Sequence, residues 1–422
     1  MNRFQKQYAA ETSIRNIVQD NPFMSWKDRL HDVQVSSSKN GLIQGFRDVD
    51  CVVKIIPVSK NARQELMSNQ FQVWRELAAV RWINHLIKTN VCPNYPMLYY
   101  WIVIEHCQEN FNNDIEEPHA LFLFMEQANL DLCTWIHDLS NCNLKISKCT
   151  IKYDTLSDMQ QLDFWYSMCF QIFAGIYAVQ KKYGVVHRDL HWKNILIKHT
   201  SYDNGAVFDY TLKKIHFFIP LFKCQFMIAD FGKNMRKQDQ LMQSDVVDGL
   251  SDSSRNLFIQ GADKRWANFN IYRSKKQIED IFRFSHLPEW LTEHNIPIET
   301  IPLEIRDMFK HIQTTWKMRE YKSIDEILLE SMYKFLDPRI GTQCHDKITT
   351  ASDFISIGEL LVYNGLFAMV LHVYGDMAKL LKSIKSFDTI EVDIVQLGRP
   401  IDFIDIPTQF QTKIVGRFDL DG

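Results

Sequence analysis

Residues 185–197 read VVHRDLHWKNILI, a short polar loop between two apolar runs. Within this loop, Asp189 and Asn194 stand five residues apart. Phosphoryl transfer needs a carboxylate that receives the proton of the acceptor hydroxyl, and an oxygen ligand that helps to hold a metal ion. A carboxylate and an amide across one tight loop can meet both needs. We therefore predict a phosphoryl-transfer site at this loop.

A second motif lies downstream, where residues 226–232 read FMIADFG. An apolar strand is expected there, ending at Asp230 with Gly232 after it. A carboxylate in this place could chelate Mg²⁺ on the phosphates of a nucleotide. Both motifs together arise by chance far less often than either alone. They favour one shared site over two ordinary loops.

The two motifs, HRDxxxxN and DFG, make the sequence resemble the eukaryotic-type protein kinases over most of residues 31–275. The resemblance implies an α+β, two-lobed fold, with a small lobe of five antiparallel strands plus one helix and a large, mostly helical lobe. It implies ATP and Mg²⁺ as cofactors, and a protein with a Ser or Thr acceptor as substrate. Asp189 would then be the catalytic base, while Asn194 and Asp230 would hold the metal.

The catalytic loop is similar to that of haspin-type kinases, HRDLHWGN. His191 replaces the Lys that common serine/threonine kinases carry two residues after the catalytic Asp, and we expect it near the γ-phosphate. Arg188 matches the residue that binds the phosphate in kinases regulated by loop phosphorylation. No APE motif follows residue 232, and a long stretch at 198–225 separates the motifs. Both features occur in haspins, and the unconventional activation segment also occurs in divergent kinases of large DNA viruses.

An acidic anchor for the catalytic loop is expected downstream of both motifs. Residues 270–273 read NIYR and resemble the DIYR of haspins, with Asn270 in place of the Asp. A neutral amide is a weaker acceptor for backbone N–H groups than a carboxylate. Asp263 therefore remains an alternative anchor.

Phosphate-binding residues follow from the resemblance. Lys54 ends the run CVVK, which looks like the strand motif whose Lys binds the α- and β-phosphates. Ser36, Ser38 and Gly41 take the three glycine places of the family's GxGxxG loop. Serine keeps a backbone amide for phosphate but lacks the freedom of glycine at positive φ.

The strand-to-hinge passage of the family resembles residues 122–128. Met125 takes the gatekeeper position, and Glu126 and Gln127 follow with backbone groups for adenine. A helix with one apolar face is predicted over residues 61–86. Of its two carboxylates, Glu76 lies beside the apolar face, whereas Glu65 stands only 11 residues after Lys54. We therefore choose Glu76 as the partner of Lys54.

Local patterns organise the rest of the chain. Strands are predicted at residues 33–35, 41–46, 51–58, 97–105 and 121–126, and an apolar helix at 162–183 that Gly184 ends. We divide the chain into an N-terminal extension (1–30), an N-lobe (31–127) and a C-lobe (128–422) that contains an insertion at 198–225 and a divergent C-terminal helical region. Within that region, the apolar run 355–374 contains Glu359, Asn364 and His372, which favours a buried helix over a membrane span.

Composition excludes several other classes of protein. With 48 Lys and Arg against 51 Asp and Glu, the net charge is −3, so we expect no direct nucleic-acid partner and no binding to membrane surfaces. The nine cysteines form no CxxC pair, which argues against a zinc site or a disulfide framework. The polar residues 1–20 do not resemble a signal peptide, so an intracellular location is expected, cytoplasmic or nuclear, in a host cell or virion if the protein is viral. The oligomeric state is open.

Two other functions remain open. A small-molecule phosphotransferase of the aminoglycoside or choline kinase type carries a similar D-L-H-x-x-N loop, but Arg188 and Gly232 favour a protein kinase. The serines in the phosphate loop and Asn270 favour a pseudokinase scaffold. Four retained residues argue against it, namely Lys54, Asp189, Asn194 and Asp230. The basic residues Lys233, Arg236 and Lys237 could meet an acidic substrate, although such a run is usually a solvated surface.

Overall fold

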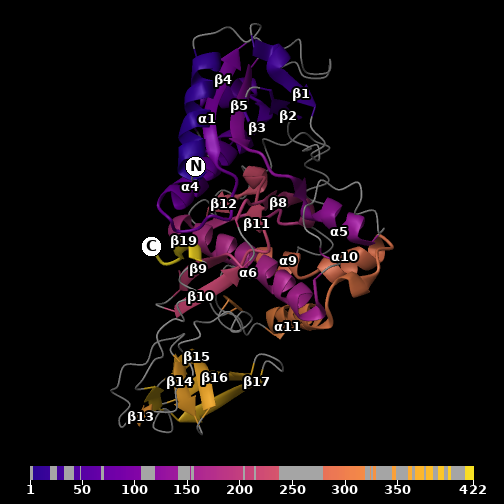
Figure 1. The fold of residues 1–422 in the computed structure, drawn as a ribbon. Helices are drawn as coiled ribbons and strands as arrows, with labels where there is room; N and C mark the ends of the chain where they lie inside the picture. The colour runs from indigo at the N-terminus through magenta and orange to yellow at the C-terminus, as the bar shows by residue number, and fades with distance from the viewer. Residues whose placement is uncertain are drawn as a thin grey trace.

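The computed structural model shows an α+β protein whose chain passes from a β-sheet at one end, through a layer of helices, to a second sheet at the other end (Figure 1). The structure describes residues 3–19, 26–32, 42–47, 49–67, 71–105, 119–140, 153, 156–202, 205–212, 215–236, 279–318, 324, 327–328, 345–347, 360–363, 366–374, 377–383, 388–393, 398–400 and 414–422.

The first sheet confirms the prediction of five antiparallel strands. Its strands lie in the order β1-β2-β3-β5-β4, so β3 is central, and β5 lies between β3 and the edge strand β4. Their bounds are β1 (Leu30–Asp32), β2 (Leu42–Phe46), β3 (Cys51–Pro57), β4 (Leu98–Glu105) and β5 (His119–Glu126). Four strands lie at their predicted places. β1 lies just before the predicted 33–35, which falls outside the described residues.

A helix that the sequence reading missed covers part of this sheet. Helix α1 (Arg3–Val18) packs along β4, with Ile14 and Val18 buried and the Arg15 guanidinium 5.2 Å from the centre of the Tyr100 ring (Figure 1). The segment is polar apart from a few positions and shows little periodicity. Its helical state therefore depends on contact with the sheet rather than on its own pattern.

The single helix predicted over residues 61–86 is wrong, because the segment forms two helices. Helix α3 (Lys60–Gln64) ends at Glu65, whose φ of −119° and ψ of 65° are not helical. Helix α4 (Gln72–Lys88) then begins after Phe71. The indole N–H of Trp74 donates to the carbonyl of Ala62 over 2.8 Å, so α3 folds back onto the first turn of α4. This contact favours two helices over one continuous helix.

Helix α6 (Asp158–Tyr183) lies at the centre of the helical layer and confirms the helix predicted at 162–183. A capping box between Ser157 and Gln160 begins it, and Gly184 ends it in the left-handed region at φ 66°. Gln160–Tyr183 is long and apolar enough to cross a membrane, but 89% of its most apolar window is buried inside the protein. It is the core helix around which the neighbouring elements pack.

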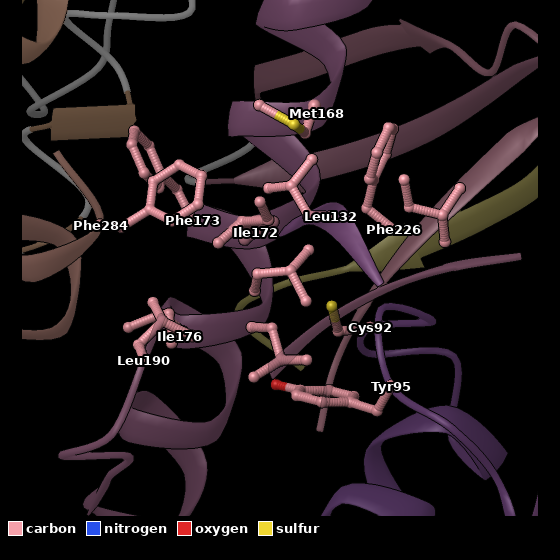
Figure 2. Close-up of a cluster of buried hydrophobic side chains, with 14 of the residues drawn as sticks. Cys92, Tyr95, Leu132, Met168, Ile172, Phe173, Ile176, Leu190, Phe226 and Phe284 are labelled. Atoms are coloured by element: carbon pink, nitrogen blue, oxygen red, sulfur yellow. The ribbon is translucent and has the colours of Figure 1, made fainter. Parts of the chain in front are cut away.

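Around α6, side chains from distant segments form one core. Figure 2 shows Met168, Ile172, Phe173 and Ile176 of α6 facing side chains of other segments. Those side chains come from the loop after α4 (Cys92, Tyr95), from α5 (Leu132–Ser140), from β11 (Cys224–Ile228) and from α9 (Glu279–Phe284). The Tyr95 hydroxyl also donates to the Gly175 carbonyl. The core thereby holds the segments that carry both sequence motifs.

Short strands fix the two motif loops. β8 (Ile195–His199) lies between β11 and β6 (Leu130–Asp131), and Ile195 of β8 pairs with Ile228 of β11. This antiparallel register brings Asn194 and Ala229 to the same end of the sheet. β7 (Val185–Val186) pairs with β12 (Met235–Arg236) on the other side of the two loops. The predicted insertion contains the hairpin β9 (Val207–Leu212) and β10 (Ile215–Pro220).

Beyond residue 278 the prediction of a helical region is only partly correct. This region contains the helices α9, α10 (Leu287–Glu293) and α11 (Leu303–Met318), with the short 3-10 turn η8 (Ile298–Thr300) between the last two. Earlier in the chain, three further 3-10 turns are η1 (Lys27–Arg29), η4 (Trp192–Asn194) and η5 (Phe231–Lys233). The later segments form a six-stranded antiparallel sheet, shown in yellow at the bottom of Figure 1. Its strands are β13 (His345–Lys347), β14 (Leu360–Tyr363), β15 (Leu366–Tyr374), β16 (Met377–Ser383), β17 (Asp388–Asp393) and β18 (Gly398–Pro400).

The buried helix predicted for residues 355–374 is therefore wrong, since β14 and β15 form a hairpin there with Tyr363 paired to Leu366. A short apolar run cannot be assigned to helix or strand by periodicity alone. The last strand, β19 (Ile414–Asp419), leaves the six-stranded sheet and pairs in parallel with β9.

The left-handed conformation of Gly184 gives a test of how α6 ends. A Cβ is strained at φ 66°, so Gly184→Ala is expected to lower the free energy of unfolding by about 1 kcal/mol. Gly184→Asn is the matched control and should lose less, because Asn tolerates this region better. Urea denaturation would measure both. Equal stability of the Ala variant and the unmodified chain would contradict the assigned end of α6.

Candidate active site

A buried carboxylate anchors the backbone of the HRD loop. Asp280 of α9 is fully buried and accepts the backbone N–H groups of His187 and Arg188, each over 2.8 Å. Arg283, one turn later, donates to the Arg188 carbonyl. Charge-assisted bonds of this kind hold Arg188 at a positive φ of 65°, which is unfavourable for a residue with a Cβ.

This geometry corrects the predicted anchor. Neither Asn270 nor Asp263 lies among the described residues, and the carboxylate that holds the loop belongs to Asp280. Residues 280–283 read DIFR, which retains the acid and the arginine of DIYR and exchanges only the aromatic residue. The sequence analysis matched NIYR at 270–273, left Asn270 and Asp263 open as anchors, and did not consider Asp280. An intact acid was the better signal, because the anchor accepts two N–H groups.

His187 joins the two motif loops. Its Nε2–H donates to the Ala229 carbonyl over 2.9 Å, and its Nδ1 accepts the Asp189 backbone N–H over 3.2 Å. Both ring nitrogens are thus used by a neutral imidazole. The ring lies 4.6 Å from that of Phe231, which is itself buried. The Asp189 loop and the Asp230 loop therefore have a fixed spacing.

Within the HRD loop, Asn194 faces Asp189 and His191. Its Nδ2 donates to the Asp189 carbonyl over 2.9 Å and lies 3.3 Å from Nε2 of His191, which accepts from it. The His191 Nε2 is also 3.9 Å from an Asp189 carboxylate oxygen. Burial lowers the pKa of His191 even though the Asp189 carboxylate raises it. These contacts describe a neutral imidazole beside the predicted base.

Lys54 lies between two carboxylates that come from different parts of the chain. Its ammonium contacts Glu76 of α4 and, over 2.8 Å, Asp230 of the DFG loop. Lys54 and Glu76 are only 3% and 2% exposed. Glu65, the carboxylate not chosen, is exposed just after α3. The structure thus brings together Lys54, Glu76 and Asp230.

Burial and charge set the protonation of this trio. Burial lowers the pKa of Lys54, but the two adjacent carboxylates outweigh it and raise the pKa above its ordinary value. Burial raises the pKa of Asp230, but the Lys54 ammonium and the Gly232 N–H hold it below its ordinary value. Lys54 is therefore a cation and Asp230 an anion at neutral pH.

Gly232 allows the close approach of α4 to this loop. A Cβ on Gly232 would lie 2.9 Å from the Gln72 Nε2 and 3.1 Å from the Glu76 Oε2. Both atoms are the ends of α4 side chains, so a side chain here would have to move the Gln72 amide and the Glu76 carboxylate that contacts Lys54. The glycine of DFG thereby has a packing reason in this chain.

The strand register places the predicted gatekeeper near Lys54. Val52 pairs with Met125, and Lys54 pairs with Leu123, so these four side chains share one face of the sheet. Val52 and Met125 are half-buried there. The sequence reading missed Val52, although its place two residues before Lys54 on a strand indicates the same face.

Glu126 has a structural role that the sequence analysis did not predict. Its backbone N–H donates to the Met97 carbonyl over 2.8 Å, so this group is not free for adenine. Its buried carboxylate accepts from Lys198 of β8 over 2.6 Å and from the Met97 N–H over 3.1 Å. Glu126 therefore links the first sheet to β8. The backbone of the half-buried Gln127 remains a candidate for adenine.

Some predicted residues are not placed. Ser36, Ser38 and Gly41 lie outside the described residues. In the described part of the chain, no group of three or more His, Cys, Asp or Glu side chains could hold a metal ion. One carboxylate and one amide, from Asp230 and Asn194, still fit Mg²⁺, which usually takes its other ligands from phosphates and water.

Comparison with known proteins supports a distant relationship to protein kinases. No family model matches the chain. Over 167 residues, the chain is 23% identical to a protein named "Probable serine/threonine-protein kinase 380R" from Invertebrate iridescent virus 6. The match covers 38% of this chain and 27% of the viral protein. The chain is similar to a viral serine/threonine-protein kinase over that stretch.

The role of Asp280 as anchor can be tested with a substitution that changes one oxygen of its carboxylate. Asp280→Asn replaces an acceptor of two N–H groups by an amide whose NH₂ must face one of them, so a loss of about 1–3 kcal/mol in unfolding free energy is expected. Chemical denaturation measures it. Asn270→Ala is the control for the alternative anchor and should change stability by less than about 0.5 kcal/mol. A larger loss at Asn270 than at Asp280 would contradict the assignment.

Removing Lys54 should make stability depend on pH. In Lys54→Met, Glu76 and Asp230 lose their cation, and a loss of about 3–5 kcal/mol is expected at pH 7. Burial already raises the pKa of Glu76, and without Lys54 it rises further. A raised folded-state pKa gives stability at low pH that is lost as pH increases through it, so part of the loss should be recovered at pH 5.

Lys54→Met combined with Glu76→Gln is the matched control for this pH effect. The double variant carries no ionisable group at Glu76, so it should be more stable than Lys54→Met at pH 7 and vary less between pH 5 and pH 7. Thermal unfolding at the two pH values measures both. The same pH dependence in the single and double variants would contradict the role of Glu76.

Proposed function

We propose that the protein is an ATP-dependent serine/threonine protein kinase that needs Mg²⁺. The observation that carries this proposal is the convergence of five residues from three segments, which are β3, the HRD loop and the DFG loop. Lys54 of β3 contacts Asp230, His187 links the Asp230 loop to the Asp189 loop, and Asn194 bonds to Asp189. The similarity to a viral serine/threonine-protein kinase supports it independently.

In this proposal each residue has a distinct task. Lys54, held by Glu76, binds nucleotide phosphates, while Asp230 and Asn194 hold Mg²⁺, which neutralises phosphate charge when bound. Asp189 orients the acceptor hydroxyl and takes its proton. The hydroxyl oxygen forms a bond to the γ-phosphorus, and the bond from that phosphorus to the bridging oxygen breaks. Its electron pair leaves with ADP.

The proposed architecture is a two-lobed kinase. The first sheet with α4 corresponds to residues 31–127, and the helical layer around α6 belongs to residues 128–422. Val52 and Met125 would contact the adenine between them. The loop HRDLHWKN and the neutral His191 support a haspin-like kinase in particular. An intracellular location, cytoplasmic or nuclear, remains part of the proposal.

A melting experiment tests nucleotide binding before any substrate is known. At about 100 times its dissociation constant, Mg²⁺–ATP should stabilise the protein by roughly 2.7 kcal/mol. Asp230→Ala should lose most of this shift, because its carboxylate is a proposed metal ligand. Asp189→Asn is the matched control and should keep it, since this residue acts on the acceptor. Absence of any shift in the unmodified chain would contradict the proposal.

Transfer is tested with labelled ATP and separate panels of proteins, peptides and small molecules. Label on Ser or Thr that Asp189→Asn reduces by several orders of magnitude, with the melting shift intact, is the expected result. Label only on small molecules would favour an aminoglycoside or choline kinase type of enzyme. Binding without transfer would favour a pseudokinase scaffold. Activity of Asp189→Asn close to that of the unmodified chain would contradict its role as base.

A further inference from the structure

The predicted base has a cationic neighbour that the motifs do not assign. Lys233 directly follows the DFG turn, and its Nζ lies 2.9 Å from an Asp189 carboxylate oxygen. The Lys233 side chain is 45% exposed and that of Asp189 is 21% exposed. The sequence analysis gives Lys233 only as one of three basic residues that could meet an acidic substrate or form a solvated surface. The structure moves it to the acceptor side of the site.

The position of Lys233 is fixed by its neighbours rather than by the ion pair. Phe231 is buried against His187, and Gly232 packs against α4. On the other side, buried Asn234 donates to the carbonyls of Phe231 and Arg75, the latter over 3.2 Å. The backbone on both sides of Lys233 is thus held to the core. Its side chain alone is free to change partners.

An exposed ion pair contributes little to stability, so little free energy holds Lys233 on Asp189. Among the described residues near Asp189, we find no other lysine or arginine in an ion pair with its carboxylate. Lys54 is committed to Glu76 and Asp230, and the exposed Lys193 makes no ion pair with Asp189. His191 accepts from Asn194 and therefore offers no fixed positive charge.

We propose that Lys233 is a catalytic residue that leaves Asp189 to bind the γ-phosphoryl group of ATP during transfer. This inference rests on the proposed function and adds a residue to it. During transfer, charge is spread over the oxygens of the moving phosphoryl group, and a nearby ammonium stabilises that charge. The proton of the acceptor passes to Asp189, whose carboxylate becomes free as Lys233 departs. Lys233 keeps its own proton throughout.

Nucleotide binding tests the γ-phosphate contact without turnover. Calorimetry would compare Mg²⁺–ADP with the magnesium complex of an imido-bridged, nonhydrolysable ATP analogue. Lys233→Ala should weaken binding of the analogue by about tenfold while changing ADP binding by less than about twofold. Lys193→Ala is the matched control, because Lys193 is an exposed lysine on the Asp189 loop that makes no ion pair with Asp189, and it should change neither. Equal effects of Lys233→Ala on both nucleotides would overturn the inference.

Kinetics test the role in transfer. Lys233→Ala should lower kcat by about 100-fold with KM for ATP changed far less, and Lys233→Arg should restore most of it. The melting temperature of Lys233→Ala should stay within about 2 °C of the unmodified chain, because the ion pair is exposed. A kcat within threefold of the unmodified chain would overturn the inference alone. Failure of the unmodified chain to bind either nucleotide would instead contradict the proposed function and the inference with it.

Discussion

A buried ammonium group organises the candidate site. Lys54 is almost fully buried, and a buried charge is tolerated only when opposite charges lie close to it. The two carboxylates that do so are carried by α4 and by the loop after β11, so three elements must meet at one point. Three features allow these elements to come together at Lys54. They are the packing of α4 on the sheet, the glycine at position 232 and the short β8–β11 ladder. The convergence of β3, α4 and the Asp230 loop therefore follows from the need to pair the buried Lys54 ammonium with carboxylates.

A second constraint holds the acceptor side of the site. Asp280 is also buried, and its carboxylate accepts two backbone N–H groups. Those bonds keep the loop from 187 to 194 in a shape that includes a positive φ at Arg188. Unfavourable backbone geometry of this kind persists only when the surroundings determine it strongly. Here the surroundings are α9, whose acid and arginine both bind the loop.

Much of this arrangement could be predicted from the sequence, because local pattern and spacing carried it. The β-branched and aromatic content of residues 41–46, 51–58, 97–105 and 121–126 predicts strands, and the long apolar run ended by Gly184 predicts α6. The choice of Glu76 over Glu65 followed from the apolar face of the helix. By contrast, α1 is helical because it packs on a sheet, and the split between α3 and α4 depends on Trp74 reaching Ala62. Such contacts join residues that the local pattern does not relate. The anchor was missed for another reason, since NIYR at 270–273 was taken as the match and DIFR at 280–283 was not considered. The ion pair of Lys233 with Asp189 depends on how two loops meet.

The strand β19 carries a consequence for how the molecule is made. It pairs in parallel with β9, roughly two hundred residues earlier, and Asp419 also donates to the Asn90 carbonyl. During synthesis the hairpin of β9 and β10 is complete before β19 is translated, so one edge of β9 has no partner strand while the six-stranded sheet is being translated. Open strand edges of this kind can pair with other chains. Folding of the insertion is thus coupled to residues 414–419, and a ribosome-bound chain that lacks them leaves the β9 edge unpaired.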